Sequence, residues 1–488
     1  MLNTQLFSFL IIVGYLVALI LIIYNKKKKE SRAMESAESF FMANRGVNAV
    51  LLPLTMIAAM QSTFAFLGAP GMYYTHGISF MVLILSQVWV ALMVIYFGNR
   101  IRVLANKYNY ISIGEYLEDR FQSRYINILA SIISVTMTMV FLSMQYVGNA
   151  RAMQVVTGGL VPYNVAILIG VVFSLIYVSV GGAGGVVLID AIQAVVLMIG
   201  IVIAAIIALG PVGGIESLFQ KTMETAPELL SRPGPKGLYN NKYWIMQFIV
   251  LPFGIWFCPH IWARSLMAKD KKAIAMSAIS IPVSQVLIYA FSTLFVGLAG
   301  HQLLGQVDAA DNVLPMMMMQ NSNWLIAAII MAAAIAAGMS TINSMLLEIS
   351  KIVSQDLVLY KKKNTVSGSE NMRITRIIIV IVATISAAIA LRPPATLVQV
   401  VQDVAYTGLA QIAPGFILSL YWPKVSKQGV AAGMTFGIVV LFALRILQMS
   451  PMGFPGFMWA FFGNIIITVL ISMGNTDKDL RVEEKFFF

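Results

Sequence analysis

The chain has 488 residues, of which 59% are hydrophobic and only 11% are charged. Its mean hydropathy of +0.82 lies far above the range of soluble domains, and it predicts a membrane protein without room for a separate catalytic or nucleic-acid-binding domain. The net charge of +12 comes from basic residues clustered in short loops beside apolar segments, a pattern typical of membrane topology rather than of nucleic-acid binding.

Apolar segments of about twenty residues recur along the whole chain, and each is long enough to cross a hydrocarbon core of about 30 Å. We expect an all-α multi-pass membrane protein with thirteen transmembrane helices. The expected spans cover approximately residues 6–24, 47–70, 78–99, 124–155, 163–180, 186–209, 241–262, 274–299, 324–350, 374–391, 396–421, 428–447 and 456–473.

The first span has no basic residue before it and no small-residue cleavage site, so we expect it to be retained rather than removed as a signal peptide. Most Lys and Arg residues lie in loops that would share one side of the membrane. The positive-inside rule therefore predicts an outer N-terminus and a cytoplasmic C-terminus. These basic loops are residues 26–45, 100–124, 264–272, 351–376 and 424–427, with the tail 478–485.

Two connections differ from the short loops. Residues 210–243, rich in Pro, Gly and mixed charge, are expected to form a partly ordered outer loop, and residues 361–373 a solvated cytoplasmic hinge. Cys258 is the only cysteine, which excludes an intrachain disulfide. The three histidines lack metal-ligand spacing, so a metal centre has little support.

Polar residues interrupt the second span near its centre, at Gln61, Ser62 and Thr63. Polarity at this depth is costly in lipid, and local unwinding would expose backbone carbonyls to a ligand instead. Gly254 and Pro259 predict a similar break in the seventh span. Two broken helices five spans apart indicate inverted repeats with a binding site at the bilayer midplane. The alternative is a pair of tolerated kinks.

The expected organisation of the chain has five parts. The expected parts are residues 1–46 with the first span and a basic loop, 47–209 with the first repeat, 210–240 as an outer loop, 241–421 with the second repeat, and 422–488 with two peripheral spans and a cytoplasmic tail.

The ninth span carries a stripe of oxygen-bearing side chains. Ser340, Thr341, Ser344 and Glu348 share one helical face with Ala337, because residues three and four apart are neighbours on a helix. Polar groups at membrane depth are expensive without partners, so the stripe indicates an ion or substrate pathway. Small residues at this spacing also allow two helices to pack closely, which is the competing interpretation.

Two long motifs resemble the signatures of the sodium/solute symporter family: Gly338-Met-Ser-Thr-Ile-Asn-Ser-Met-Leu-Leu and Gly181-Gly-Ala-Gly-Gly-Val-Val-Leu-Ile-Asp-Ala-Ile-Gln. Within that family the chain is most similar to bacterial sodium/pantothenate symporters. The segments that carry this second resemblance are 66–71, 148–151, 259–260, 339–343, 392–394 and 420–422.

The resemblance implies an amino acid/sodium symporter-like fold with thirteen helices, a five-plus-five inverted repeat, and a sodium ion as the only cofactor. It places sodium between the broken second span and the stripe. The implied ligands are the carbonyls of Ala58, Gln61 and Ala337 and the hydroxyls of Ser340 and Thr341. Five neutral oxygens suit a hard monovalent cation.

A second sodium site found in some members would fall near Asp190, Asn343 and Ser344. Asn343 replaces a hydroxyl residue common in those members, and Asp190 has the alternative interpretation of an ion pair or a helix cap. Met60 stands where proline carriers place an acidic residue, which weakens the proline hypothesis.

The organic substrate is expected to meet polar groups and aromatic walls near the midplane. Plain helix packing is the alternative for each of these residues. They are Ser62, Thr63, Phe66, Gln87, Gln145, Trp256, Phe257 and Tyr406.

Three further charged residues have open roles. Arg151 would attract a carboxylate or anchor its helix at the interface, and Glu348 would line the cytoplasmic exit or pair with Lys351. For Asp403, the open role is a gating contact at the outer side.

The sequence therefore predicts a sodium-coupled secondary active symporter of the cell membrane that imports pantothenate or a related carboxylate. Monocarboxylates, proline and sugars are alternative substrates, proton coupling is an alternative to sodium coupling, and a channel or a transporter-like sensor is a less favoured class. No nucleophile, base and oxyanion arrangement supports an enzyme. The expected partners are a small molecule and the lipid bilayer, without nucleic acid or an obligatory protein partner.

Overall fold

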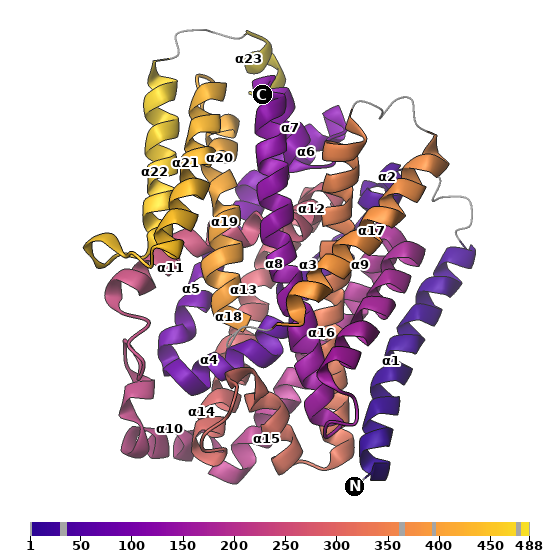
Figure 1. Ribbon diagram of the computed structural model, residues 1–488, viewed down its shortest axis with the longest axis vertical. Helices are drawn as coiled ribbons and strands as arrows, with labels where there is room; N and C mark the ends of the chain where they lie inside the picture. Colours follow the sequence, from indigo (N-terminus) through magenta and orange to yellow (C-terminus); the bar gives the residue numbers. More distant parts are fainter. Residues whose placement is uncertain (1, 30–36, 361–366, 393–396, 475–479, 488) are drawn as a thin grey trace.

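The computed structural model describes residues 2–29, 37–360, 367–392, 397–474 and 480–487. Within these ranges the chain is helical, apart from turns and one isolated β-bridge between Val47 and Ala268. Long helices run roughly side by side along the long axis of the molecule (Figure 1). Apolar side chains face both the interior and the outer surface of the bundle, as expected for a protein surrounded by lipid.

The α-helices follow one another with short connections. They are α1 (Leu2–Lys29), α2 (Ala37–Met42), α3 (Leu51–Met60), α4 (Ala69–His76), α5 (Val82–Met93), α6 (Asn99–Tyr108), α7 (Ile113–Phe121), α8 (Arg124–Val156), α9 (Tyr163–Val212), α10 (Gly214–Thr225), α11 (Asn241–Trp256), α12 (Pro259–Met267), α13 (Lys271–Gln285), α14 (Leu294–Leu303), α15 (Val313–Asn321), α16 (Trp324–Lys351), α17 (Gly368–Ala390), α18 (Leu397–Val400), α19 (Thr407–Leu409), α20 (Ala413–Tyr421), α21 (Lys427–Ile446), α22 (Gly456–Met473) and α23 (Leu480–Phe486).

Several helices are extended or joined by π-helical and 3-10 segments. The π-helical segments are η2 (Phe64–Gly68), η4 (Val94–Gly98), η6 (Val286–Thr293), η8 (Ile352–Val358) and η10 (Val401–Tyr406), and the 3-10 segments include η5 (Pro227–Leu230) and η7 (Ala310–Asn312).

Among the described residues, ten helices are long and apolar enough to cross a membrane, or eleven if the bent pair α11 and α12 forms one span. Two of the ten, Phe64–Tyr108 and Tyr163–Val212, each run through two of the expected spans. Gly182, with φ 52° and ψ −161°, interrupts the second of these between the two spans. The count of thirteen crossings stays a prediction.

The interruption expected in the second span is present. The helix α3 ends at Met60, and Gln61 adopts an extended conformation with φ −98° and ψ 108°. The chain becomes helical again at Thr63 and continues through η2 into α4. Because α3 stops here, its last carbonyl groups have no intrahelical donors.

The second break lies between α11 and α12, whose axes differ by 56°. Pro259 occupies the start of α12, a position where its missing N–H costs nothing. The expectation that Gly254 contributes to this break is wrong, because Gly254 lies inside α11. A Cβ atom there would lie 1.9 Å from the carbonyl oxygen of Tyr406, so the glycine instead permits close packing against η10.

The central helix of the bundle is α16, which packs against α8, α9 and α1. Its alanines at positions 332–334, 336 and 337 are buried, and small side chains let neighbouring backbones approach. The hydroxyl stripe therefore lies in the interior rather than facing lipid.

The two chain ends lie at opposite ends of the bundle (Figure 1). The N-terminus lies at the end that holds α10, α14 and α15, and the C-terminal helix α23 lies beside α6 and α7 at the other end. The sidedness of the membrane stays a prediction. Some of the basic residues that support this prediction lie outside the described residues. The same holds for parts of the segments 361–373 and 392–394.

The segment 210–243, which we expected to be a partly ordered loop, is more ordered than expected. It contains α10 and η5, and Leu218, Leu229 and Tyr239 are fully buried. An amphipathic helix can cover the bundle because its apolar face gains a partner there.

The helix α23 is docked onto the helices α6 and α7. Phe486 is fully buried, with its ring 5.9 Å from that of Tyr116, and its carbonyl oxygen accepts a hydrogen bond of 2.9 Å from Arg100. Lys485 forms an ion pair with Asp119. The chain end is thus fixed by burial, by a hydrogen bond and by charge.

Candidate functional site

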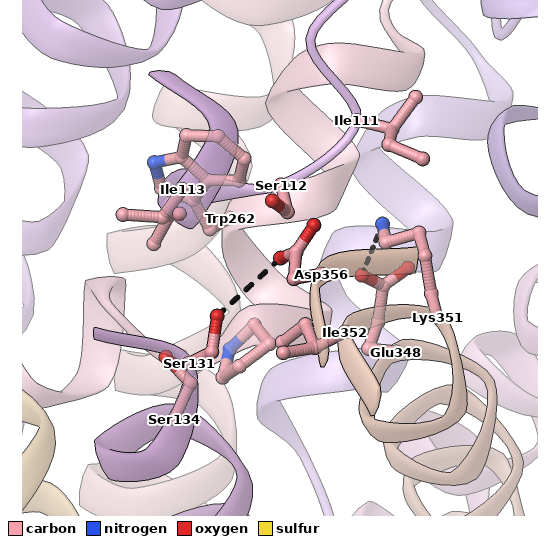
Figure 2. Close-up of a pocket in the computed structure, with 12 residues that line it drawn as sticks. Ile111, Ser112, Ile113, Ser131, Ser134, Trp262, Glu348, Lys351, Ile352 and Asp356 are labelled. Carbon is pink, nitrogen blue, oxygen red and sulfur yellow. Dashed lines mark hydrogen bonds and ion pairs between the residues drawn. The ribbon is translucent and has the colours of Figure 1, made fainter. Parts of the chain in front are cut away.

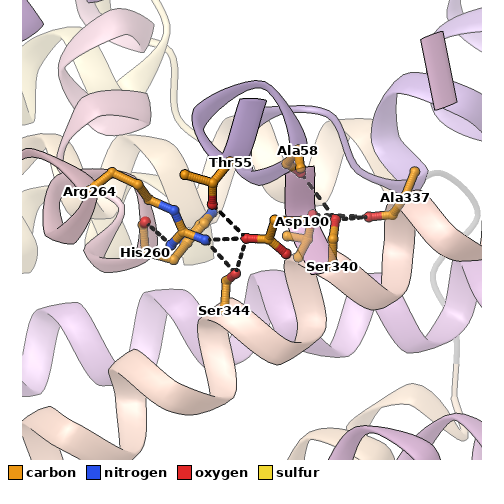
Figure 3. Close-up of polar contacts among 9 residues, drawn as sticks. Thr55, Ala58, Asp190, His260, Arg264, Ala337, Ser340 and Ser344 are labelled. Carbon is orange, nitrogen blue, oxygen red and sulfur yellow. Dashed lines mark hydrogen bonds and ion pairs between the residues drawn. The ribbon is translucent and has the colours of Figure 1, made fainter. Parts of the chain in front are cut away.

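The last turn of α3 lies against the middle of α16. The Oγ of Ser340 donates to the carbonyl oxygens of Ala58, at 3.2 Å, and of Ala337, at 2.9 Å (Figure 3). Thr341 Oγ1 donates to the same Ala337 carbonyl at 3.2 Å. All four residues are fully buried. Four of the five residues predicted as sodium ligands therefore form one cluster of neutral oxygens.

Gln61, the fifth predicted ligand, lies at the break itself. Its backbone N–H donates to Ile57 at 2.8 Å and closes the last turn of α3. Its side-chain amide is fully buried and has no hydrogen-bond partner. Within the described part of the chain no hydrogen bond joins Gln61 directly to the other four residues. Gln61 lies near them because it directly follows the last turn of α3, which contains Ala58.

A buried ion pair lies beside this cluster, between Asp190 of α9 and Arg264 of α12. Arg264 Nη2 donates to Asp190 Oδ2 at 2.6 Å, and Asp190 and Arg264 are only 1% and 2% exposed (Figure 3). Asp190 Oδ2 also accepts from Thr55 at 2.9 Å and from Ser344 at 3.3 Å. Such a pair is tolerable in a low-dielectric interior because its charges are matched and hydrogen-bonded.

This geometry bears on the second sodium site. Asp190 and Ser344 are in contact, whereas the Oδ1 atom of Asn343 has no partner. Arg264 holds both Asp190 and Ser344, donating to the latter at 2.6 Å. The arrangement fits the ion-pair interpretation of Asp190. The assignment of Arg264 to a cytoplasmic loop is wrong, because α12 extends to Met267 and buries it.

Lys351 is a second basic residue placed inside the protein rather than in a loop. It forms an ion pair with Glu348 one turn earlier on α16, and it is only 1% exposed. Of the two interpretations of Glu348, pairing with Lys351 is therefore observed.

The helix break is joined to α8 through the predicted substrate residues Thr63 and Gln145. Gln145 Oε1 accepts from the backbone N–H of Thr63 at 3.1 Å and from its hydroxyl at 2.8 Å. The hydroxyl of Ser62 accepts from the Phe64 N–H at 3.1 Å and caps the restarted helix. These contacts make Gln145 the partner of an N–H group that the break leaves without a helical acceptor.

The other predicted substrate residues do not converge on this point. Gln87 donates to Leu83 of its own helix at 3.3 Å, and its buried Oε1 has no partner. Phe66 is fully buried beside Gly200 of α9, and a Cβ on that glycine would lie 3.7 Å from the ring. The ring of Tyr406 lies 5.3 Å from that of Phe141 on α8.

Trp256 and Phe257 form an aromatic cluster with Phe416 of α20. Their ring centroids lie 4.9 Å apart, and those of Phe257 and Phe416 lie 5.3 Å apart. They lie at the end of α11, directly before the second break. The cluster is suited to hold this break in place.

At the other end of α8, Arg151 forms an ion pair with Asp311 of η7. Asp311 also accepts from the backbone N–H of Leu397, at the start of α18, at 3.4 Å. Burial raises the pKa of Asp311 to about 6, although Arg151 lowers it. Three segments far apart in the sequence are therefore tied together by one carboxylate.

Asp403 of η10 also has a partner on another helix. Its Oδ1 accepts from the hydroxyl of Tyr243 on α11 at 2.7 Å. This contact joins η10, which follows α18, to the start of α11.

A helical membrane bundle in which two broken helices meet a hydroxyl-bearing central helix has the architecture of an ion-coupled secondary transporter. The model of the sodium:solute symporter family matches residues 40–437. The chain belongs to this family: it is a sodium-coupled solute symporter and a multi-pass protein of the cell membrane, not an enzyme.

Individual relatives agree with the family assignment. The chain is 27% identical over 403 residues to the sodium/pantothenate symporter of Haemophilus influenzae, covering 82% of each chain. It is 27% identical over 456 residues to the sodium/pantothenate symporter of Escherichia coli, covering 92% of this chain and 93% of that one.

A solved structure supports the fold. A sodium-coupled sialic acid symporter in a substrate-bound outward-open state superimposes with a TM-score of 0.82 at 19% identity, covering 97% of this chain and 98% of that one.

Three residues of this site were not singled out by sequence reasoning: Thr55, Arg264 and Asp311. Arg264 has a usable signal, because it follows the apolar segment Ile261-Trp-Ala without a loop-forming residue. Thr55 and Asp311 have none, because their partners lie 135 and 160 residues away in the sequence.

Proposed function

We propose that this symporter imports pantothenate or a related small carboxylate together with sodium, by alternating access. The observation that carries the sodium part is the hydrogen bond from Ser340 across to the carbonyl of Ala58. The similarity to two sodium/pantothenate symporters over most of the chain supports the substrate.

In this proposal sodium binds to the carbonyls of Ala58, Gln61 and Ala337 and to the hydroxyls of Ser340 and Thr341. The two hydroxyls now donate to carbonyls, and rotation about their C–O bonds would turn their lone pairs toward the ion. Neutral ligands offset the dehydration of a monovalent cation while leaving the site able to release it.

The substrate pocket would share the broken helix with the ion. Ser62, Thr63, Gln87 and Gln145 would provide hydrogen bonds, with Phe66, Trp256, Phe257 and Tyr406 as apolar walls and gates. Since Gln145 bonds to Thr63, two residues beyond Gln61, a bound ion that fixes the break also fixes a group that the substrate touches. Ion and substrate then stabilise the same state, and their coupling is reciprocal.

The driving force of one ion is sufficient for a scarce nutrient. One charge moving through 100 mV yields about 2.3 kcal/mol. A tenfold sodium gradient adds about 1.4 kcal/mol. A second sodium near Asp190, Asn343 and Ser344 would have to share the carboxylate with Arg264, which already balances its charge, so we propose that one sodium ion is transported per cycle.

The proposed topology has thirteen crossings with an outer N-terminus and a cytoplasmic C-terminus. It consists of repeats 47–209 and 241–421, flanked by residues 1–46, the outer segment 210–240 and residues 422–488. The placement of the two chain ends at opposite ends of the bundle supports an odd number of crossings (Figure 1). We propose that the protein transports without an obligatory protein partner.

The test is uptake of radiolabelled pantothenate into proteoliposomes with an inward sodium gradient. We expect sodium-stimulated uptake that unlabelled pantothenate abolishes and that proline, sugars and short monocarboxylates leave intact. Competition by one of those solutes would reassign the substrate. Uptake driven by a pH gradient without sodium would reject sodium coupling, and a conductance above carrier turnover would indicate a channel.

A further inference from the structure

A small cavity lies at the inner end of the hydroxyl stripe, between α7, α8, α12 and the last turns of α16 (Figure 2). Its free space is about 10 Å³, room for about one water molecule. Its polar lining comes from Ser112, Ser131, Ser134, Glu348, Lys351 and Asp356.

Glu348 is a residue of this cavity that has an unused ligand atom. Lys351 pairs with its Oε2 atom, and the side chain is only 2% exposed, yet Oε1 has no hydrogen-bond partner. A buried carboxylate oxygen without a partner is costly. A cation or a water in the cavity would remove that cost.

The cavity and the proposed sodium site lie along the same face of α16. Thr341, Ser344 and Glu348 follow each other at spacings of three and four residues on α16. At 1.5 Å per residue, Glu348 lies about 10 Å along the axis from Thr341. Oxygen-bearing groups thus continue from the ion site to the inner end of the helix.

Asp190 repeats the arrangement of Glu348 halfway along this face. One of its oxygens is held by Arg264, beside Ser344, and the other, Oδ1, has no partner. In both pairs a tethered cation balances the carboxylate while one oxygen stays available. An isolated carboxylate at this depth would be far more costly than a balanced one.

We propose that Glu348 binds the sodium ion transiently on its way to the cytoplasm, and that Lys351 takes the carboxylate back when the ion leaves. This inference rests on the proposed function, because it needs sodium to pass from Ser340 and Thr341. The serine hydroxyls of the cavity and a water supply further oxygen ligands for the ion. Lys351 prevents the empty site from holding an unbalanced charge.

The test compares outer and inner sodium dependence in proteoliposomes of fixed orientation. The variant is Glu348→Gln combined with Lys351→Met, which removes both charges and leaves neither unpaired. We expect an unchanged outer sodium concentration for half-maximal uptake. The inner sodium concentration that halves uptake should rise about tenfold, which corresponds to 1.4 kcal/mol of lost binding.

The matched control is Ser350→Ala, which also removes a buried polar group without a partner from α16 but does not line the cavity. It should keep both sodium dependences. Glu348→Gln alone should lower the melting temperature, because it leaves Lys351 buried and unpaired, and the double variant should recover it.

An unchanged inner sodium sensitivity in the folded double variant would overturn the inference and leave sodium coupling intact. Sodium-independent uptake by the wild type would instead reject the proposed function together with it. If the double variant does not fold, Glu348→Asp provides the same test, because it keeps the charge and shortens its reach. It should raise the inner half-inhibitory concentration, and no rise would again overturn the inference.

Discussion

The hydroxyl of Ser340 on α16 donates a hydrogen bond of 3.2 Å to the carbonyl of Ala58 in the last turn of α3. These residues are 282 positions apart in the sequence, and they belong to the two expected repeats. Since α3 ends at Met60, the carbonyl is available to a partner outside its own helix. One hydroxyl therefore joins the broken helix to the central helix.

Removing that hydroxyl should lower the affinity for sodium far more than it lowers the stability of the folded protein. We expect Ser340→Ala to raise the sodium concentration for half-maximal uptake about tenfold, as the loss of about 1.4 kcal/mol of ion binding would. Thr341→Ala should act in the same direction. The control Thr384→Ala removes a hydroxyl that only bonds within α17. Unaltered sodium activation in both site variants would contradict the proposed ligands.

Truncating Gln145 should weaken substrate binding through the break. Gln145→Ala removes the acceptor for the N–H and hydroxyl of Thr63, so we expect the substrate concentration for half-maximal uptake to rise about tenfold. Gln145→Asn retains a neutral amide acceptor on a shorter side chain and should show a smaller rise. Saturation curves at fixed, saturating sodium measure both. A normal curve for the alanine variant would make this glutamine a packing residue.

Adding a methyl group at Gly254 should force α11 and η10 apart. The added Cβ would meet the Tyr406 carbonyl at 1.9 Å, and such overpacking typically costs about 1–3 kcal/mol. We expect Gly254→Ala to lower both the melting temperature and the uptake rate. Gly210→Ala is the matched control, because nothing lies within 4 Å of its added Cβ. Equal behaviour of the two variants would show that the contact is looser than described.

Asp311 should make the stability depend on pH. Its folded-state pKa of about 6 lies above the ordinary value of 3.8, because burial raises it. The folded protein therefore binds this proton more readily, and the free energy of unfolding gains a favourable contribution as the pH falls from about 6 to about 4.

The measurement is the melting temperature of the detergent-solubilised protein across that pH range. Asp311→Asn should lose the contribution, whereas Asp308→Asn, at an exposed position of the same loop, should keep it. Parallel pH curves for the wild type and Asp311→Asn would exclude Asp311 as the titrating group.

Local sequence patterns predicted the breaks and the local pair of Glu348 with Lys351, but they did not identify the distant partner of Asp190. Gln61 and Pro259 disturb the helix at their own positions, so an apolar run with such a residue is informative by itself. Asp190 and Arg264 are 74 residues apart, and only the packing of α9 against α12 decides that they meet. Charge counting therefore placed Arg264 and Lys351 in loops, since it has no access to burial. The prediction of a break at Gly254 was wrong for a related reason, because a glycine permits either a kink or a close contact and the sequence does not distinguish the two.

The docked helix α23 has a practical consequence. It lies against α7, and the residues that begin α7, Ser112 and Ile113, also line the cavity beside Glu348. An affinity tag or fluorescent protein fused to the carboxyl end of the chain would pull directly on the contact between α23 and α7. Purification and imaging fusions are better placed at the amino end, where α1 lies at the rim of the bundle.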